Sequence, residues 1–223
     1  MSGKETQLVP IELLRTLQLR LLEQSWKHQT HHLSSSFSTL PILIEVYQKL
    51  GSMDRFILSN GHAAPALYVV LEHFLSQDSD AFFVNMGDHP KRQIENGIFC
   101  STGSLGMGLT VAVGMALAKP NNFVHCVISD GECCEGSIWE SLRFAKNKRI
   151  DNLAVYVNMN GWSAYDSIDT LELEKELKSV FPKIQIRESN SFPFEESGLD
   201  AHYFKLSEKQ YLEARERICA KNL

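Results

Sequence analysis

The feature that most restricts the fold is a regular alternation of β-rich runs and helical patterns in the second half of the chain. The β-rich runs occupy residues 123–129, 152–157 and 183–187, and the helical patterns occupy residues 103–118, 137–147, 171–180 and 207–220. Strands that alternate with helices are joined by right-handed crossovers and pair in parallel. The alternation therefore predicts an α/β fold with a doubly wound, mostly parallel sheet.

The first half of the chain contains further helical patterns, one short strand and two polar segments. Helices are expected at residues 8–26, 40–50 and 63–75, and a strand at residues 55–59. Pro41 fits the first turn of its helix, where the N–H that proline lacks would have no partner. Residues 28–38 are polar and serine-rich, which predicts an exposed loop, and residues 76–102 are predicted to be irregular.

Length and charge narrow the class of protein. The 223 residues make one large domain, so we expect a single domain over 1–223. The net charge is −5, from 22 Lys and Arg against 27 Asp and Glu, which predicts no nucleic-acid surface. The longest apolar stretch, about residues 63–71, is far shorter than the ~20 residues that span a membrane. The five cysteines show neither paired nor metal-ligand spacing, so we expect a reduced, cytoplasmic protein.

Polar residues follow two consecutive strands of the predicted sheet. Asp130 and Gly131 come directly after one strand, and Asn160 follows the next, 160 − 130 = 30 residues later. A carboxylate and an amide oxygen at neighbouring strand ends suit Mg²⁺ or Ca²⁺, with a diphosphate resting on Gly131 and a helix N-terminus. Asp-Gly and Asn-Gly are also ordinary turn dipeptides, so these residues alone leave both readings open.

Four ordered motifs add a family resemblance. The segment Asp130-Gly-Glu-x-x-Glu-Gly-x-x-Trp-Glu140, followed by Asn160-Gly161, resembles the thiamine-diphosphate motif of transketolases. Residues 54–68 resemble the transketolase segment that carries an active-site histidine, and residues 101–109 resemble its S-T-G-S-L-G-Q-G-L loop. His89-Pro90 precedes Gly103 by 14 residues, as the G-H-P motif of the family does. The resemblance covers about residues 10–165.

The resemblance implies a cofactor site for thiamine diphosphate and Mg²⁺. Asp130, the Asn160 side chain and the Trp162 carbonyl would hold the metal, and Gly131 would leave room for the diphosphate. The aminopyrimidine side would be lined by Gly103, Ser104 and Leu105. Glu135 matches a glutamate at the interface that couples paired sites.

The resemblance also implies three catalytic histidines. His62 would face the thiazolium ring of the cofactor, and His89 would contact the substrate hydroxyls. Residues 31–38 overlay the family segment G-H-P-G-G-S-L-S, so His32 takes the place of another catalytic histidine. Imidazoles suit this chemistry because ketol transfer needs proton removal and return near neutral pH.

Three departures from the transketolase motifs limit which properties of the family can be expected of this chain. The family segment G-H-P-G-G has become His31-His-Leu-Ser-Ser35, the first glycine of G-D-G has become Ser129, and a glutamine has become Met107. The pyrimidine-binding domain of transketolases has no counterpart in the chain. We therefore expect the N-terminal subunit of a split transketolase, which acts on sugars or sugar phosphates.

A C-terminal, pyrimidine-binding subunit would be its partner, in an α2β2 assembly, and the chain alone would be inactive. Two alternatives remain at this point. One is a catalytically inactive scaffold that keeps the fold. The other is a subunit of a different thiamine-diphosphate enzyme, either a synthase of the deoxyxylulose-phosphate type or a 2-oxoacid dehydrogenase.

Overall fold

Four parallel strands form one sheet in the part of the chain that this computed structural model describes, residues 9–163, 165–188, 192–194 and 204–220. They are β1 (Arg55–Leu58), β2 (Val124–Ser129), β3 (Leu153–Met159) and β4 (Gln185–Glu188), and their order in the sheet follows the chain. Ser129 at the end of β2 lies opposite Asn158 of β3. Because the strands are parallel, their carboxyl ends meet at one edge of the sheet.

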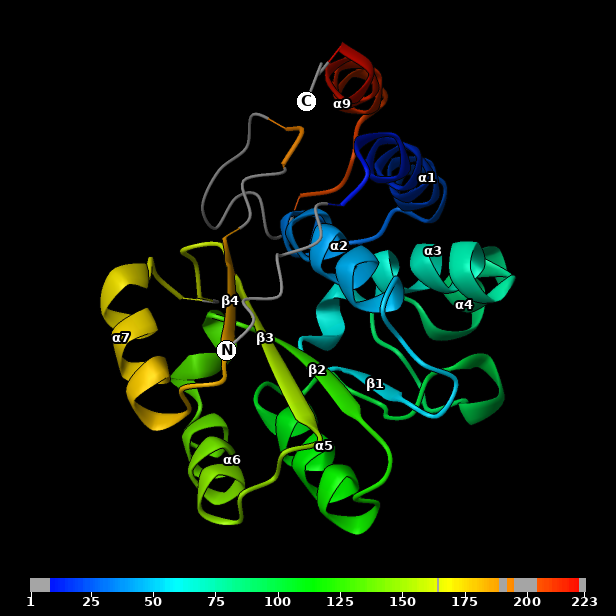
Figure 1. Cartoon of the computed structure of the whole chain (residues 1–223). Helices are drawn as coiled ribbons and strands as arrows, with labels where there is room; N and C mark the ends of the chain where they lie inside the picture. Colours follow the sequence, from blue (N-terminus) through cyan, green and yellow to red (C-terminus); the bar gives the residue numbers. More distant parts are fainter. Residues whose placement is uncertain (1–8, 164, 189–191, 195–203, 221–223) are drawn as a thin grey trace.

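Helices cover both faces of this sheet (Figure 1). One face packs against α5 (Met107–Ala118), α6 (Gly136–Asn147) and α7 (Thr170–Val180), and it receives strand residues such as Cys126 and Val155. Val127 and Tyr156 point to the other core, which contains α2 (Leu33–Tyr47) and α3 (Ala64–Leu75). These observations confirm the predicted α/β class with a parallel sheet.

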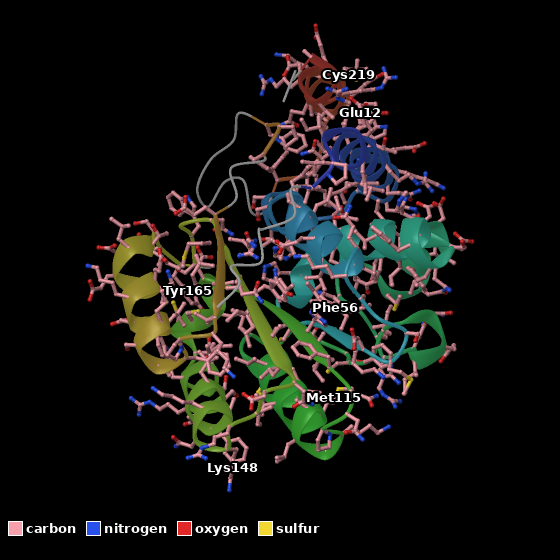
Figure 2. The ribbon with its side chains drawn as sticks, viewed as in Figure 1. Glu12, Phe56, Met115, Lys148, Tyr165 and Cys219 are labelled. Carbon is pink, nitrogen blue, oxygen red and sulfur yellow. The ribbon has the colours of Figure 1, made fainter. Side chains whose placement is uncertain are left out.

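Further helices pack outside α2 and α3. They are α1 (Ile11–His28), α4 (Ser79–Met86) and α9 (Glu208–Ala220). Helix α9 lies beside α1, where the rings of Trp26 and Tyr211 stack with centroids 5.6 Å apart. In Figure 2, Phe56 of β1 lies inside the molecule, whereas Lys148 lies at the outer end of α6. The core is therefore two apolar layers, one on each side of the strands.

The prediction of an exposed loop at residues 28–38 is wrong. Helix α2 begins at Leu33, so Pro41 lies inside the helix rather than in its first turn. Ser35, Ser36 and Ser38 are buried, and the fold supplies the Ser38 hydroxyl with partners. Ser38 Oγ donates to the Ser35 carbonyl at 3.2 Å and accepts from Asn158 Nδ2 at 2.8 Å. Polarity was therefore a misleading signal: a serine with partners can be a core residue.

The prediction for residues 76–102 was only partly right. Helix α4 forms within this segment, and the Asp78 side chain caps it by accepting from the Ala81 N–H at 3.1 Å. A short 3-10 turn, η2 (Ile94–Asn96), follows, and the rest is irregular. The apolar residues Phe82 and Phe83 are buried against α3. Eight residues were too few for a clear helical period in the sequence.

No helix among the described residues has the length and apolar character needed to cross a membrane.

Candidate active site

Asp130 sits at the end of β2, at the edge where the strands finish. Its side chain is fully buried. Oδ2 accepts the N–H groups of Asn160 at 2.8 Å and Gly161 at 2.6 Å, and Oδ1 accepts the N–H of Gly131 at 3.0 Å. Asp130 and Asn160 thus lie at neighbouring strand ends, as the 30-residue spacing predicted, and the Asp130 carboxylate holds the two ends together.

The electrostatics of Asp130 favour a nearby cation. Burial raises the pKa of its carboxyl to about 6, and the N–H groups of Gly161, Asn160 and Gly131 oppose that rise. Among the residues that the structure describes, no cationic side chain pairs with Asp130. A buried carboxylate without such a partner carries a desolvation cost, which a divalent ion would offset.

The oxygens predicted to hold Mg²⁺ lie around the same turn. Asn160 Oδ1 accepts from the Trp162 N–H at 3.0 Å. A Cβ built on Gly131 would lie 3.3 Å from the Trp162 carbonyl oxygen, so that carbonyl borders the turn after Asp130. The donors are a carboxylate, an amide and a carbonyl oxygen, which fit a hard cation. Among the described residues, no three His, Cys, Asp or Glu side chains form a cluster that could hold a metal ion, so a cation here would be held by one carboxylate and neutral oxygens.

The three predicted histidines come together from separate segments. His62 lies in η1 (Gly61–Ala63), directly after β1, and His32 precedes α2 with φ 56°. The ring centroids of His32 and His62 are 5.3 Å apart, and those of His32 and His89 are 6.2 Å apart. His89 follows α4. The structure therefore gathers residues that span almost sixty positions of the chain.

The loop at Gly103 closes one side of this cluster. A Cβ on Gly103 would lie 2.8 Å from His89 Cδ2, and a Cβ on Gly61 would lie 2.7 Å from the Gly103 nitrogen. These two glycines let the loop lie directly against the histidine segments. Ser104 is exposed and Leu105 is half-buried in the same loop.

Glu132 is the site residue to which the sequence assigned no role. Its side chain is fully buried in η3 (Gly131–Cys134). It accepts the Ser59 hydroxyl at 2.8 Å, the Gly106 N–H at 2.8 Å and the Ser129 N–H at 3.2 Å. Burial raises its pKa to about 7, although the Gly106 N–H and the Ser59 hydroxyl lower it. The available signal was its place inside the Asp-Gly-Glu motif.

Glu135 lies at the N-terminus of α6, half-buried. A Cβ on Gly106 would meet the Glu135 Cβ at 2.9 Å, so this residue borders the same loop that Glu132 holds. Its predicted role at an interface between paired sites remains a prediction.

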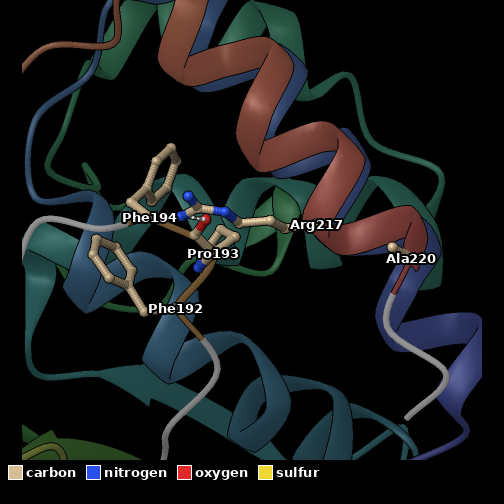
Figure 3. Close-up of a pocket in the computed structure, with 5 residues that line it drawn as sticks. All are labelled: Phe192, Pro193, Phe194, Arg217 and Ala220. Atoms are coloured by element: carbon tan, nitrogen blue, oxygen red, sulfur yellow. Dashed lines mark hydrogen bonds between the residues drawn. The ribbon is translucent and has the colours of Figure 1, made fainter.

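A separate pocket of about 290 Å³ lies away from these residues (Figure 3). Phe192, Pro193, Phe194, Arg217 and Ala220 line it. The Arg217 guanidinium donates to the Pro193 carbonyl at 3.2 Å. None of the predicted site residues takes part in this pocket, so it does not belong to the histidine site.

Comparison with known proteins identifies the family. The family described as "Transketolase, thiamine diphosphate binding domain" matches residues 46–179, which is more than half of the chain. The chain belongs to this transketolase family. The matched residues include the ends of β1, β2 and β3, the Gly103 loop, His62 and His89. The predicted family resemblance is thereby confirmed.

Two relatives are themselves named as transketolase subunits. The 6-deoxy-6-sulfo-D-fructose transketolase subunit of Clostridium sp. (strain MSTE9) is 34% identical over 159 residues, covering 62% of this chain and 58% of the relative. An apulose-4-phosphate transketolase subunit from Phocaeicola vulgatus is 34% identical over 161 residues, covering 63% of this chain and 57% of the relative. The match thus spans somewhat more than half the length of these transketolase relatives.

Solved transketolases share the fold. The transketolase from Leishmania mexicana has a TM-score of 0.76 at 19% identity, covering 96% of this chain and 42% of that chain. The transketolase from Pichia stipitis in complex with sedoheptulose 7-phosphate has a TM-score of 0.75 at 19% identity, covering 94% and 40%. At this identity the likeness establishes the transketolase fold alone.

Proposed function

We propose that the chain is the thiamine-diphosphate-binding subunit of a two-component, Mg²⁺-dependent transketolase-like enzyme, which transfers a two-carbon ketol unit between sugars or sugar phosphates. The observation that carries this proposal is the gathering of His32, His62 and His89 beside the Gly103 loop. The buried Glu132 connects that loop to the turn after Asp130. A metal-and-diphosphate end and a histidine end therefore belong to one continuous site.

The metal end uses three oxygen ligands. Asp130, the Asn160 amide oxygen and the Trp162 carbonyl would hold Mg²⁺, and the diphosphate would complete its shell. Gly131 would lie against the diphosphate, while Gly103, Ser104 and Leu105 would face the aminopyrimidine. Mg²⁺ commonly takes one or two carboxylates plus phosphate oxygens, and Asp130 supplies the carboxylate.

The histidine end holds the substrate and moves protons. Thiamine diphosphate, when bound, supplies the ring that stabilises a carbanion. His62 would face that ring, and His32 and His89 would take a proton from a substrate hydroxyl and return it. The left-handed backbone at His32 turns its ring towards the other two, whose centroids lie at 5.3 and 6.2 Å from it.

An exposed apolar face on α5 supports a partner subunit. Met107, Val111 and Leu117 are 49%, 38% and 50% exposed, and they lie along one side of the helix. A Cβ on Gly114, on the same side, would meet nothing within 4 Å. Apolar faces of this kind mark contacts with other chains. We propose that a second copy of this chain and a pyrimidine-binding subunit cover it, in an α2β2 assembly, with Glu135 at the shared interface.

Cofactor binding tests the metal end. Calorimetry with thiamine diphosphate should show Mg²⁺-dependent binding by the wild type, alone or with its partner subunit, and little or none by Asp130→Asn. Asp151→Asn, a change at an exposed aspartate, is the control. If Asp130→Asn kept the wild-type affinity, Asp130 would not be a metal ligand.

Turnover by the complex tests the histidine end. His62→Ala and His89→Ala should bind thiamine diphosphate normally but lose about 10²–10⁴-fold in rate, because each removes acid–base assistance. His32→Ala should behave in the same way. The chain without its partner should show no ketol transfer. Full turnover by the isolated chain would contradict the two-component proposal, and an inactive complex that still binds the partner would favour a scaffold.

A further inference from the structure

A histidine–carboxylate pair lies beside the three histidines. His31 Nδ1 is 3.1 Å from Asp88 Oδ2, and the His31 backbone N–H donates to the same oxygen at 3.4 Å. The His31 side chain is 41% exposed and the Asp88 side chain is 20% exposed. One carboxylate therefore holds both the backbone and the ring of His31, while part of the ring remains open to a ligand.

The pair joins two segments that carry proposed catalytic histidines. His31 directly precedes His32, and Asp88 directly precedes His89. The ring centroids of His31 and His32 are 6.5 Å apart. The contact between His31 and Asp88 therefore fixes the separation between the two segments at the edge of the site.

Both members of the pair stand where the resembling motifs have glycine. His31 replaces the first residue of G-H-P-G-G, and Asp88 replaces the first residue of the later G-H-P. A glycine has no side chain, so the family pattern leaves this edge empty. Here two substituted positions, 57 residues apart, contact each other. The two substitutions are therefore explained together, because each supplies one partner of the contact.

The chemistry of the pair determines which nitrogen remains available. An ionised carboxylate only accepts hydrogen bonds, so the nitrogen that faces Asp88 carries the proton. In the neutral ring, Nε2 then holds a lone pair and can accept a hydrogen bond. No hydrogen bond from the described part of the chain to His31 Nε2 is observed. This is the arrangement by which a carboxylate orients an imidazole in many active sites.

We infer that His31 is a fourth histidine of the substrate end, fixed in one tautomer by Asp88, and that its Nε2 accepts a hydrogen bond from a sugar hydroxyl. The inference rests on the proposed function. His31 directly precedes His32, which we propose moves a proton of the substrate. We therefore assign the hydroxyl as one adjacent to the reacting carbonyl of an aldose acceptor. The pair then selects acceptors that carry this hydroxyl, since a site built around a hydroxyl discriminates against an analogue that lacks it.

The first test determines which ring nitrogen of His31 carries the proton, and it uses this chain without a partner. Long-range ¹H–¹⁵N spectra of the ¹⁵N-histidine-labelled protein should show neutral His31 protonated at Nδ1. In Asp88→Asn, whose amide can donate to Nδ1, the ring should move towards the Nε2-protonated form. Asp78→Asn, at the start of α4, is the matched control and should leave His31 unchanged. An Nε2-protonated His31 in the wild type would overturn the inference.

The second test compares D-ribose with 2-deoxy-D-ribose as acceptors, using the chain with its partner subunit. His31→Gly and Asp88→Asn should raise KM for D-ribose about tenfold and change kcat little, because the lost hydrogen bond serves binding. The preference for D-ribose should fall about tenfold in both. An unchanged preference in an active complex overturns the inference alone. A wild-type complex that transfers no ketol unit overturns the proposed function, and the inference with it.

Discussion

Glu132 is the residue on which the most segments of the site depend. Its carboxylate receives a hydroxyl from the end of β1, an N–H from the Gly103–Gly106 loop and an N–H from the end of β2. Ionisation inside the protein is costly, as the raised pKa shows. Removal of the carboxylate would nevertheless cost more stability than its burial does. It would leave three donors without their partner, and a buried donor without a partner costs about 1–3 kcal/mol.

Replacing Glu132 should therefore destabilise the fold. We expect Glu132→Ala to lower the free energy of unfolding by about 1–3 kcal/mol, the cost of the orphaned donors less the relief of the buried charge. Urea unfolding at neutral pH measures this loss of stability. Glu140→Ala, at an exposed position of α6, is the matched control. Equal midpoints for the two variants would show that the carboxylate does not hold these segments.

His125 should make stability depend on pH. It is 8% exposed, its Nδ1 lies 3.2 Å from the Tyr156 hydroxyl, and burial lowers its pKa more than nearby Asp54 raises it. Its pKa is thus lower in the folded protein than in the unfolded chain, where it is about 6.5. At this residue the unfolded chain binds more protons than the folded protein below about pH 6.5, so His125 contributes a loss of stability on acidification, whereas the raised pKa values of Asp130 and Glu132 contribute in the opposite direction.

The measurement is urea unfolding at about pH 5.5 and about pH 7.5. His125→Gln should lose the contribution of His125 to the difference between the two pH values, so that its stability at the lower pH rises relative to that of the wild type. His73→Gln, an exposed histidine, should keep it. A pH dependence identical in His125→Gln and the wild type would contradict this assignment.

At the scale of elements, α5 depends on one close contact with β1. A Cβ on Gly108 would lie 2.5 Å from the Ser59 Cα, so the helix and the strand end approach with no room for a methyl group. Gly114, six residues later in α5, has open space where a Cβ would lie. One helix therefore contains a glycine that the packing requires and one that it does not.

The two glycines give a matched pair of variants. Gly108→Ala should destabilise the protein by about 1–3 kcal/mol, because the methyl group overlaps backbone that cannot move alone. Gly114→Ala should stabilise it by about 0.5–1 kcal/mol, because alanine is the better helix former. Thermal unfolding of both compares them directly. A similar loss of stability in both variants would contradict the assigned role of the contact between Gly108 and Ser59.

Elements with a clear period were predictable, and those without one were not. β2, β3, α6 and α7 follow the sequence pattern closely, because each buries a regular set of apolar residues. The start of α2 was missed because its serines are buried, and the partner of Ser38, Asn158, lies more than a hundred residues away in the sequence. Likewise, the motifs named His32, His62 and His89, but no local signal could show that Asp88 contacts His31.

At the scale of the whole molecule, the α5 face should control association. The wild-type chain should self-associate, and the double variant Val111→Glu/Leu117→Glu should reduce that association by placing charges on the apolar face. Sedimentation velocity over a range of concentrations measures both. Val84→Glu, at a 74% exposed apolar position on α4, is the control. A wild type that stays monomeric at its solubility limit would contradict this use of the face.

The positions of the three tryptophans have a practical consequence. Trp139 donates its indole N–H to the Cys133 carbonyl at 2.8 Å, and Trp162 borders the same turn, whereas Trp26 stacks on Tyr211 between α1 and α9. Two of the three tryptophans therefore belong to the segments that form the proposed diphosphate site, Trp139 through its indole and Trp162 through its backbone. Their fluorescence emission should change when a ligand binds at this site, so the unlabelled protein carries its own optical reporter of ligand binding.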